Sequence, residues 1–174
     1  MNAADKRPAG RIALSGILAA GSLLTLFLAT ILPTNRIFFY GLSSVFCAII
    51  IIEHGVRAGT IFYIGTSLFA LMLIPNKIRL IPYILILGHY PLWKTFIERI
   101  NHTGKELILK LLVLNIFSLA AYYGFTALFF EHVILPIDLR LVFLLLQIVF
   151  IIYDYAFTLF IIFYLKTIKP IINN

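Results

Sequence analysis

Apolar residues in this chain form long runs that are separated by short clusters of charged residues, glycine and proline. The clearest run begins after Arg57, holds no charged residue, and stops at Pro75-Asn76-Lys77. A helix that spans a bilayer needs roughly 20 mostly apolar residues. By this criterion the pattern predicts six spanning segments, at 12–32, 37–52, 58–74, 80–93, 107–130 and 139–165.

The fourth predicted segment differs from the others because it is short and contains Pro82, Gly88, His89 and Pro91. Proline and glycine are tolerated at membrane depth where neighbouring helices satisfy the freed backbone groups. We therefore expect this segment to be tilted, broken or sheltered by its neighbours.

The longest connection, 94–106, follows this segment and also has a helical pattern. Its apolar residues Phe96, Ile97 and Ile100 fall at helical spacing, and Gly104 is suited to ending a helical turn. This pattern predicts a short amphipathic helix on the cytoplasmic surface.

Composition agrees with a membrane protein. Of the 174 residues, 62% are apolar and only 12% are charged, whereas a soluble domain carries about a quarter charged residues. The mean hydropathy is +1.05. We predict an all-α integral membrane protein, a bundle of six transmembrane helices that forms a single domain over 1–174. The apolar run that begins at Ile12 continues to about Leu32, longer than the roughly 7–15 residues of a signal-peptide core, so we expect it to be retained as the first helix.

The distribution of positive charge predicts the orientation. With both termini in the cytoplasm, Arg36, Lys77, Arg79 and Arg140 lie outside. The other ten of the 14 Lys and Arg residues then lie inside, which agrees with the positive-inside rule. These ten are Lys6, Arg7, Arg11, Arg57, Lys94, Arg99, Lys105, Lys110, Lys166 and Lys169. Because most of these charges flank apolar segments, the net charge of +7 does not indicate a nucleic-acid partner.

Small residues recur along the first segment. Ser15 and Ala19, and also Gly16 and Ala20, are four residues apart, and Ala13 is three residues before Gly16. Such a stripe lets another helix backbone approach closely in lipid. Packing within this protein and docking to a partner subunit both account for it.

The four predicted outer cations lie in three short loops. If these loops converge, Asn and Arg donors form a polar cap that is suited to a carboxylate or phosphate. Interfacial anchoring and loop-closing salt bridges are the alternative. At about 1.5 Å per residue, Tyr122, Tyr123 and Gln147 lie about two turns below this cap, and Tyr83 and Thr66 lie on neighbouring segments. They either line the floor of an outward-facing pocket or make ordinary hydrogen bonds between helices.

Asp154 is the only acidic residue well inside a predicted membrane segment, which makes it a candidate for function. Asn115 lies at nearly the same predicted depth, so a contact of Asp154 with Asn115 or with a tyrosine is a structural explanation. His89 is interpreted in the same way, as an interior histidine with satisfied nitrogens. A proton-coupled carrier that acts alone would depend on Asp154 and His89.

Catalytic signatures are missing from the sequence. Glu53-His54 and Glu131-His132 are predicted on opposite membrane faces, and no His-Glu-x-x-His motif occurs. No glycine-rich phosphate loop is present, so the chain does not hydrolyse ATP by itself. The single cysteine, Cys47, excludes an intramolecular disulfide. We predict a protein that is not an enzyme and has no metal or cofactor.

Local sequence resembles a transporter family. The chain reads RIALSGILAA at 11–20, LPTNR at 32–36 and EHGVRAGTIFYIGTSLFALMLIPNK at 53–77. In these stretches, in length and in predicted helix number, it resembles over nearly its whole length the S component, the substrate-binding membrane subunit, of energy-coupling factor (ECF) transporters. In that family an Ala-x-x-x-Ala motif in the first helix contacts the coupling subunit. Here Ser15-x-x-x-Ala19 and Gly16-x-x-x-Ala20 stand in its place, so the resemblance implies partner docking by Ala13, Ser15, Gly16, Ala19 and Ala20.

The resemblance also implies a function: uptake of a small polar or anionic micronutrient, such as a vitamin, across a prokaryotic plasma membrane. The expected partners are membrane lipid, a coupling transmembrane subunit, two ATP-binding cassette ATPases and a small-molecule substrate. The implied substrate site comprises Asn35, Arg36, Asn76, Lys77, Arg79, Tyr83, Tyr123, Arg140 and Gln147. The alternative is a non-catalytic membrane scaffold that resembles the six-helix cell-shape protein MreD. Because the only tryptophan, Trp93, lies at the predicted inner boundary, large planar ligands are disfavoured.

Overall fold

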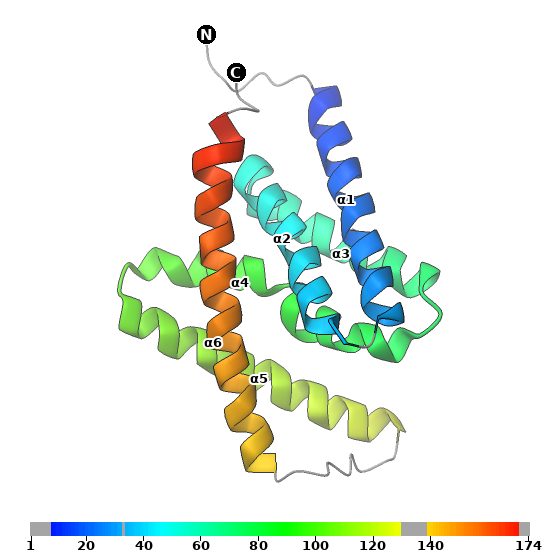
Figure 1. Cartoon of the computed structure of the whole chain (residues 1–174), viewed down its shortest axis with the longest axis vertical. Helices are drawn as coiled ribbons and strands as arrows, with labels where there is room; N and C mark the ends of the chain where they lie inside the picture. The colour runs from blue at the N-terminus through cyan, green and yellow to red at the C-terminus, as the bar shows by residue number, and fades with distance from the viewer. Residues whose placement is uncertain (1–7, 33, 130–138, 171–174) are drawn as a thin grey trace.

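The computed structural model of the protein describes residues 8–32, 34–129 and 139–170, and every regular element in these ranges is helical (Figure 1). The α-helices are α1 (Pro8–Ile31), α2 (Arg36–His54), α3 (Val56–Leu73), α4 (Tyr90–Ile97), α5 (Thr103–Phe129) and α6 (Leu139–Phe163). Four short elements complete the fold: the 3-10 turns η1 (Lys77–Leu80) and η3 (Glu98–Ile100), and the π-helical turns η2 (Tyr83–Leu87) and η4 (Tyr164–Ile168).

Five helices (α1, α2, α3, α5 and α6) are long and apolar enough to cross a membrane. By length and composition, the chain is therefore a multi-pass membrane protein. The predicted all-α architecture is confirmed for the described residues, and five of the six predicted segments correspond to these helices. The sixth crossing and the cytoplasmic position of the termini stay predictions.

The fourth predicted segment is broken, as its proline and glycine residues suggested. After Pro82 the chain forms the π-helical turn η2, and α4 begins only at Tyr90. The amide of Gly88 closes this turn by donating to the carbonyl oxygen of Tyr83 at 2.6 Å. A Cβ on Gly88 would lie 2.8 Å from the Tyr63 ring, so only glycine fits this close approach.

The predicted helix in 94–106 is present only over 94–100, as the end of α4 and the turn η3, and it is not a separate surface helix. Helix α4 ends at Ile97, and the 3-10 turn η3 then leads to Asn101, whose left-handed φ of 52° ends the helical path. Gly104 does not end a turn, because it lies in the first turn of α5. Lys94 and Ile97 are buried rather than at a surface. The physical reason is that Lys94 has acidic partners in the interior, so its charge does not mark a loop.

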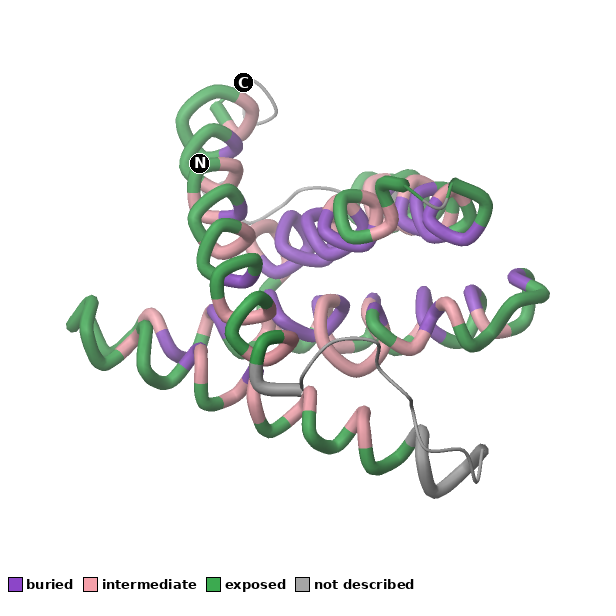
Figure 2. Tube along the Cα trace, turned by 60° about the horizontal axis from the view of Figure 1, so that its bottom comes forward, coloured by how far each residue is buried: buried purple, intermediate pink, exposed green. Residues whose placement is uncertain are grey.

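The helices do not form a parallel bundle. Helices α1, α2 and α3 pack together, whereas α5 crosses α6 at a wide angle (Figure 1). One core cluster joins α2 to α4, α5 and α6 and includes Cys47, Ile50, Tyr90 and Phe150. A second cluster lies between α1, α3 and the η1–η2 region. Long exposed stretches remain on α5 and α6 (Figure 2), and in a bilayer these apolar faces contact lipid.

Close backbone packing joins α2 to α3. Gly55, with a φ of 86°, connects the two helices, and the Cys47 thiol of α2 donates to the carbonyl oxygen of Gly59 in α3 at 3.6 Å. A Cβ on Gly59 would lie only 2.2 Å from Cγ1 of Ile51. The hairpin of α2 and α3 therefore depends on the missing side chain of Gly59.

We expect Gly59→Ala to lower the free energy of unfolding by about 1–3 kcal/mol, because overpacking shifts side chains and backbone. The measurement is thermal denaturation of the purified protein in mild detergent. Gly65→Ala in the same helix is the matched control, since a Cβ there meets no atom within 4 Å. Equal melting temperatures for the two variants would contradict this account of the hairpin.

Candidate functional site

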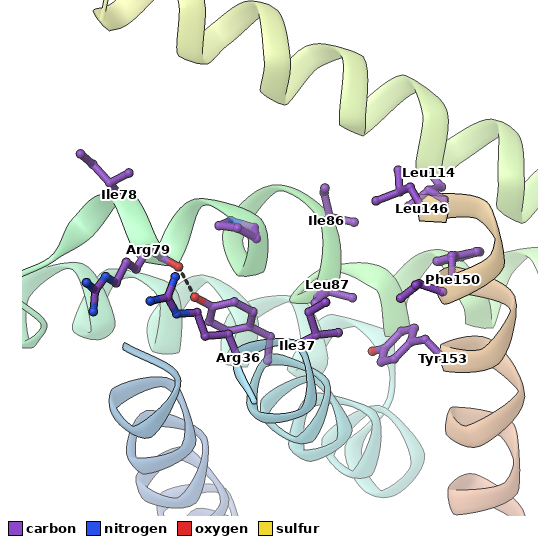
Figure 3. A pocket seen from close by; sticks show the side chains of 13 residues that line it. Arg36, Ile37, Ile78, Arg79, Ile86, Leu87, Leu114, Leu146, Phe150 and Tyr153 are labelled. Carbon is purple, nitrogen blue, oxygen red and sulfur yellow. Dashed lines mark hydrogen bonds between the residues drawn. The ribbon is translucent and has the colours of Figure 1, made fainter. Parts of the chain in front are cut away.

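A pocket of about 460 Å³ lies between α2, the η1–η2 region, α5 and α6 (Figure 3). Its volume is within the roughly 300–1,000 Å³ of typical small-molecule sites. The lining residues are Arg36, Ile37, Tyr40, Ile78, Arg79, Pro82, Ile86, Leu87, Leu114, Leu146, Val149, Phe150 and Tyr153.

Two arginines form the positive end of this pocket. Arg36 is the first residue of α2, and Arg79 lies in η1. The Arg79 guanidinium donates a hydrogen bond to the carbonyl oxygen of Thr30, and the Tyr40 hydroxyl donates to the carbonyl oxygen of Arg79. These bonds join α1, α2 and η1, so Arg79 has a structural role at the edge of the pocket.

Arg36 differs from Arg79 because no hydrogen bond from its guanidinium occurs among the described residues. Its Nε atom is buried and makes no hydrogen bond. No ion pair among the described residues includes Arg36. Figure 3 shows its guanidinium close to Arg79 at one end of the pocket. This cation is placed to receive an anion.

The rest of the pocket wall is apolar, and its two tyrosine hydroxyls are already bonded. Tyr40 donates to Arg79, as above, and the Tyr153 hydroxyl shares a hydrogen bond of 2.5 Å with the Ser44 hydroxyl on α2. Apart from the arginines, the lining side chains therefore offer no unused hydrogen-bond donor.

The structure brings two of the nine predicted substrate-binding residues to the pocket, Arg36 and Arg79. Asn35, Asn76 and Lys77 are their exposed neighbours and do not line it. The loop after α1 and the loop after α3 were predicted to lie close together. Each of them contributes one arginine to the pocket, Arg36 and Arg79 respectively.

The other four predicted residues lie elsewhere. Tyr83 is fully buried, and its ring packs 6.5 Å from the ring of Tyr40, measured between centroids. Tyr123 is exposed on α5. Gln147 donates to the Asn115 side-chain oxygen at 2.5 Å and links α6 to α5. The side chain of Arg140 lies outside the described residues.

Most of the pocket wall was not predicted from the sequence. Leu114, Leu146, Val149 and Phe150 come from long apolar helices in which no residue stands out. The break after Pro82 was the only available signal, because it indicates a segment that does not pack as a regular helix.

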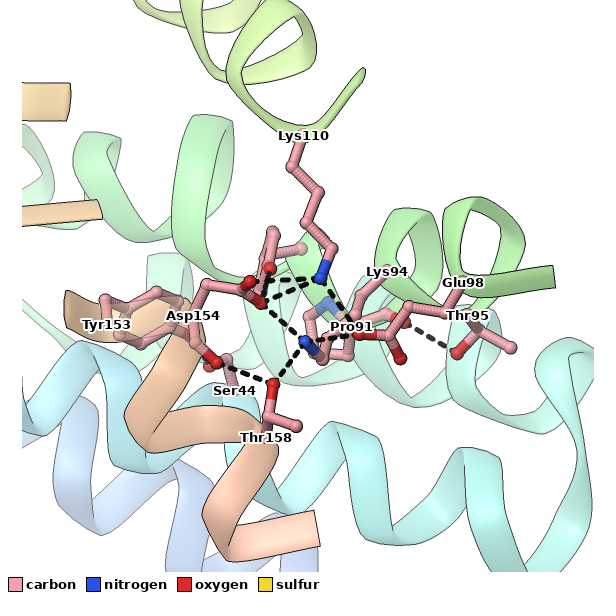
Figure 4. A network of polar contacts seen from close by, with 10 residues as sticks. Ser44, Pro91, Lys94, Thr95, Glu98, Lys110, Tyr153, Asp154 and Thr158 are labelled. Carbon is pink, nitrogen blue, oxygen red and sulfur yellow. Dashed lines mark hydrogen bonds and ion pairs between the residues drawn. The ribbon is translucent and has the colours of Figure 1, made fainter. Parts of the chain in front are cut away.

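A second polar site lies in the interior, where α4, η3, α5 and α6 meet (Figure 4). We call Lys94, Glu98, Lys110 and Asp154 the ionic cluster. Lys94 is 1% exposed and Lys110 is 5% exposed. The Lys94 ammonium lies 2.5 Å from Asp154 and 2.7 Å from Glu98, and the Lys110 ammonium lies 3.0 Å from Asp154 and 2.9 Å from Glu98.

Each charge of the cluster thus has two opposite charges as neighbours. Tyr90 also donates to Asp154, and Lys94 donates to the Thr158 hydroxyl at 2.8 Å. Buried charges are stable only when they are paired and hydrogen-bonded. The predicted contact of Asp154 with a tyrosine is confirmed, and the predicted contact with Asn115 is wrong because Asn115 pairs with Gln147.

The cluster corrects two further interpretations. Lys94 and Lys110, which were predicted at the cytoplasmic surface, are interior residues whose partner Asp154 is near the middle of α6. His89 is buried, but neither ring nitrogen has a hydrogen-bond partner. Its ring instead packs 4.2 Å from that of Phe117, measured between centroids.

A groove of about 550 Å³ separates α1 from α3. Ser15, Gly16 and Ala19 line its α1 side, and Gly65 lies on its α3 side. Ala13 and Ala20 do not line it. A Cβ on Gly16 or Gly65 would meet no atom within 4 Å, so the groove has open space above both glycines.

Internal packing of α1 uses another face of the helix. Leu18, Ser22, Leu26 and Ala29 are buried there, and Ser22 shares a hydrogen bond of 2.7 Å with Ser43 of α2. The predicted small-residue stripe therefore does not supply the main contact between α1 and α2.

No group of three or more His, Cys, Asp or Glu side chains that could hold a metal ion occurs in the described part of the chain. Glu131 and His132 lie outside it. Comparison with protein-family models, curated proteins and solved structures finds no match to this chain.

We expect Asp154→Asn to destabilise the protein by about 3–5 kcal/mol, because it leaves two buried ammonium groups with one carboxylate. Adding Lys94→Met should restore a large part of this loss, since Lys110 and Glu98 keep their 2.9 Å pair. Thermal denaturation of the single and double variants in detergent measures the coupling between the two positions.

Glu106→Gln, at the start of α5, is the control for a carboxylate-to-amide change outside the cluster, and it should alter the melting temperature little. An Asp154→Asn variant as stable as the wild type would show that the cluster contributes nothing to folding.

Proposed function

We propose that this chain is the substrate-binding membrane subunit of an ECF-type transporter, and that it takes up a small polar or anionic nutrient. The observation that carries the proposal is the pocket of about 460 Å³ with Arg36 and Arg79 at one end, neither of which is in an ion pair among the described residues. An anionic ligand would supply the carboxylate or phosphate partner that these two charges lack.

Binding without catalysis fits the chemistry of the pocket lining. None of its residues is a carboxylate, histidine, serine, threonine or cysteine. Its side chains therefore provide a positive end and an apolar wall, and no general base or nucleophile next to them. We propose accordingly that the protein is not an enzyme.

The proposed orientation places the pocket at the outer face of a prokaryotic plasma membrane. The start of α1 and the end of η4 lie at the top of Figure 1, and the connection from α1 to α2 lies well below them, at the opposite end of these two helices. Arg36 follows that connection directly. With cytoplasmic termini, the positive end of the pocket faces the outside, where a nutrient arrives.

The groove between α1 and α3 supports docking to a coupling transmembrane subunit. Gly16 and Gly65 leave room for the close approach of another helix, and Gly16 is exposed in the groove, whereas Ala19 also packs against the core. Two ATP-binding cassette ATPases would supply the energy through that subunit.

We expect Arg36→Gln to weaken binding of the co-purifying ligand by about 10- to 100-fold, since hydrogen bonds to a charged group contribute about 1.5–3 kcal/mol. Native mass spectrometry of the purified protein measures the fraction that retains a small molecule. Lys77→Gln is the matched control, because it removes one positive charge close to the pocket without changing its lining. Equal ligand loss in both variants would show that Arg36 acts only through the overall positive charge of this region and does not bind the ligand directly.

We expect Gly16→Leu to abolish co-purification of a coupling subunit and two ATPases, because the leucine fills the groove. The measurement is a pull-down of the tagged protein in mild detergent, with partners identified by mass spectrometry. Ala20→Leu, on the same helix outside the groove, should retain these partners. Recovery of envelope-assembly proteins in place of ATPases would favour the scaffold function.

A further inference from the structure

The pocket wall restricts the class of ligand more narrowly than the proposed function does. Between its positive end and Phe150, the lining side chains are aliphatic or aromatic (Figure 3). The hydroxyls of Tyr40 and Tyr153 are both engaged elsewhere. A ligand with many hydroxyl groups would lose its hydrogen bonds to water there without replacement, which is costly. An apolar body is favoured instead.

The charge of the pocket restricts the ligand further. Neither Arg36 nor Arg79 is in an ion pair among the described residues, and the bond from Arg79 to the neutral Thr30 carbonyl oxygen leaves its positive charge uncompensated. The described lining therefore offers two cationic groups at one end of an apolar space. The complementary molecule is an anion whose charge is at one end.

A second hollow suggests how such a molecule arrives. A groove of about 380 Å³ lies between α2 and α6 and shares Ile37, Val149 and Tyr153 with the pocket. Phe38 and Ile152, which line only this groove, are 65% and 63% exposed. In a membrane this apolar groove opens to lipid.

The side chain of Tyr153 lines both the groove and the pocket. The Tyr153 ring packs against Gly41, where a Cβ would lie 2.9 Å from the ring, and the Tyr153 hydroxyl bonds to Ser44. Ile37 and Val149 complete the shared boundary with apolar contacts alone. Movement of one aromatic side chain would therefore connect the two spaces without unfolding a helix.

We propose that the ligand is an amphiphilic anion with an apolar, mainly aliphatic body, and that it reaches the pocket from the bilayer between α2 and α6 past Tyr153. This inference rests on the proposed function as a binding subunit and names the substrate class and the route of entry. A fatty carboxylate and a single-chain lipid phosphate share this chemistry.

The class is tested with the full chain in phosphatidylcholine nanodiscs. Decanoate should bind measurably, and Arg36→Gln should weaken its binding at least tenfold. Two control ligands, decanol without the charge and glucose 6-phosphate without the apolar body, should each bind at least tenfold more weakly than decanoate. Decyl phosphate distinguishes the two head groups, since tighter binding than decanoate assigns a phosphate source and weaker binding a carboxylate source. Binding of glucose 6-phosphate in preference to both amphiphiles would overturn the amphiphile class.

The route is tested by the exchange kinetics of decanoate delivered in phosphatidylcholine vesicles. Tyr153→Phe removes the bond to Ser44 and keeps the ring, so it should raise the association and dissociation rates together by several-fold and change the dissociation constant less than twofold. Tyr164→Phe is the matched control, because it removes a tyrosine hydroxyl bond, to Glu53, outside both the pocket and the groove and should leave both rates unchanged. Unchanged rates in Tyr153→Phe, or equal changes in both variants, would overturn entry between α2 and α6.

Failure of this inference is distinguishable from failure of the proposed function. If ATPases co-purify but the pocket prefers glucose 6-phosphate, the subunit function stands and the ligand class is wrong. If decanoate binds through Arg36 but no ATPases co-purify, the ligand class stands and the ECF-type function is wrong.

Discussion

The pairing of Asp154 with two buried lysines is the interaction on which half of this fold depends. A carboxylate or an ammonium group alone in an apolar interior is unstable, so each must find a partner. Here the partners come from α4, η3, α5 and α6, and these segments are thereby held at one point. Because Tyr90 both donates to Asp154 and packs on Phe150, the cluster also supports a wall of the candidate pocket.

The other half of the molecule is held by a different kind of contact. Helices α1, α2 and α3 approach closely through small residues, with Ser22 bonded to Ser43 and Gly59 against Ile51. Small-residue packing of this kind is typical of helices in lipid, where apolar burial gives little driving force. The pocket lies where the two halves meet, so its shape depends on both sorts of contact.

The sequence predicted long helices well because their signal is local. The limits of α2 and α3 follow from Arg36, Gly55 and Pro75, which interrupt the apolar runs. Lys94 and Lys110 were wrongly predicted at the cytoplasmic surface. In the sequence, a lysine between two apolar runs gives the same pattern whether its side chain faces water or a buried carboxylate. The partner, Asp154, is 44 positions from Lys110 along the chain, and no local pattern reports such a pairing.

In the candidate site, too, residues with a local sequence signal were predicted and residues without one were not. Arg36 and Arg79 were predicted because cations beside prolines and asparagines mark short loops, and short loops at one membrane face lie near one another. The wall formed by Leu114, Leu146 and Phe150 was not predictable, since helix rotation decides which of many similar apolar residues face the pocket. Tyr83 is a residue that was predicted to bind substrate and does not line the pocket. Its polar hydroxyl suggested a site, but its ring is buried in the core.

The ionic cluster also has a consequence for how the chain is made. An aspartate at the centre of a helix opposes the insertion of that helix into lipid by about 2.5–3.5 kcal/mol. The lysines that neutralise Asp154 lie on α4 and α5, which precede α6 in the sequence. During synthesis from the N-terminus these lysines are therefore already present when α6 emerges. Because its partners come first along the chain, Asp154 can pair as α6 leaves the insertion machinery, and its carboxylate need not face the bilayer alone.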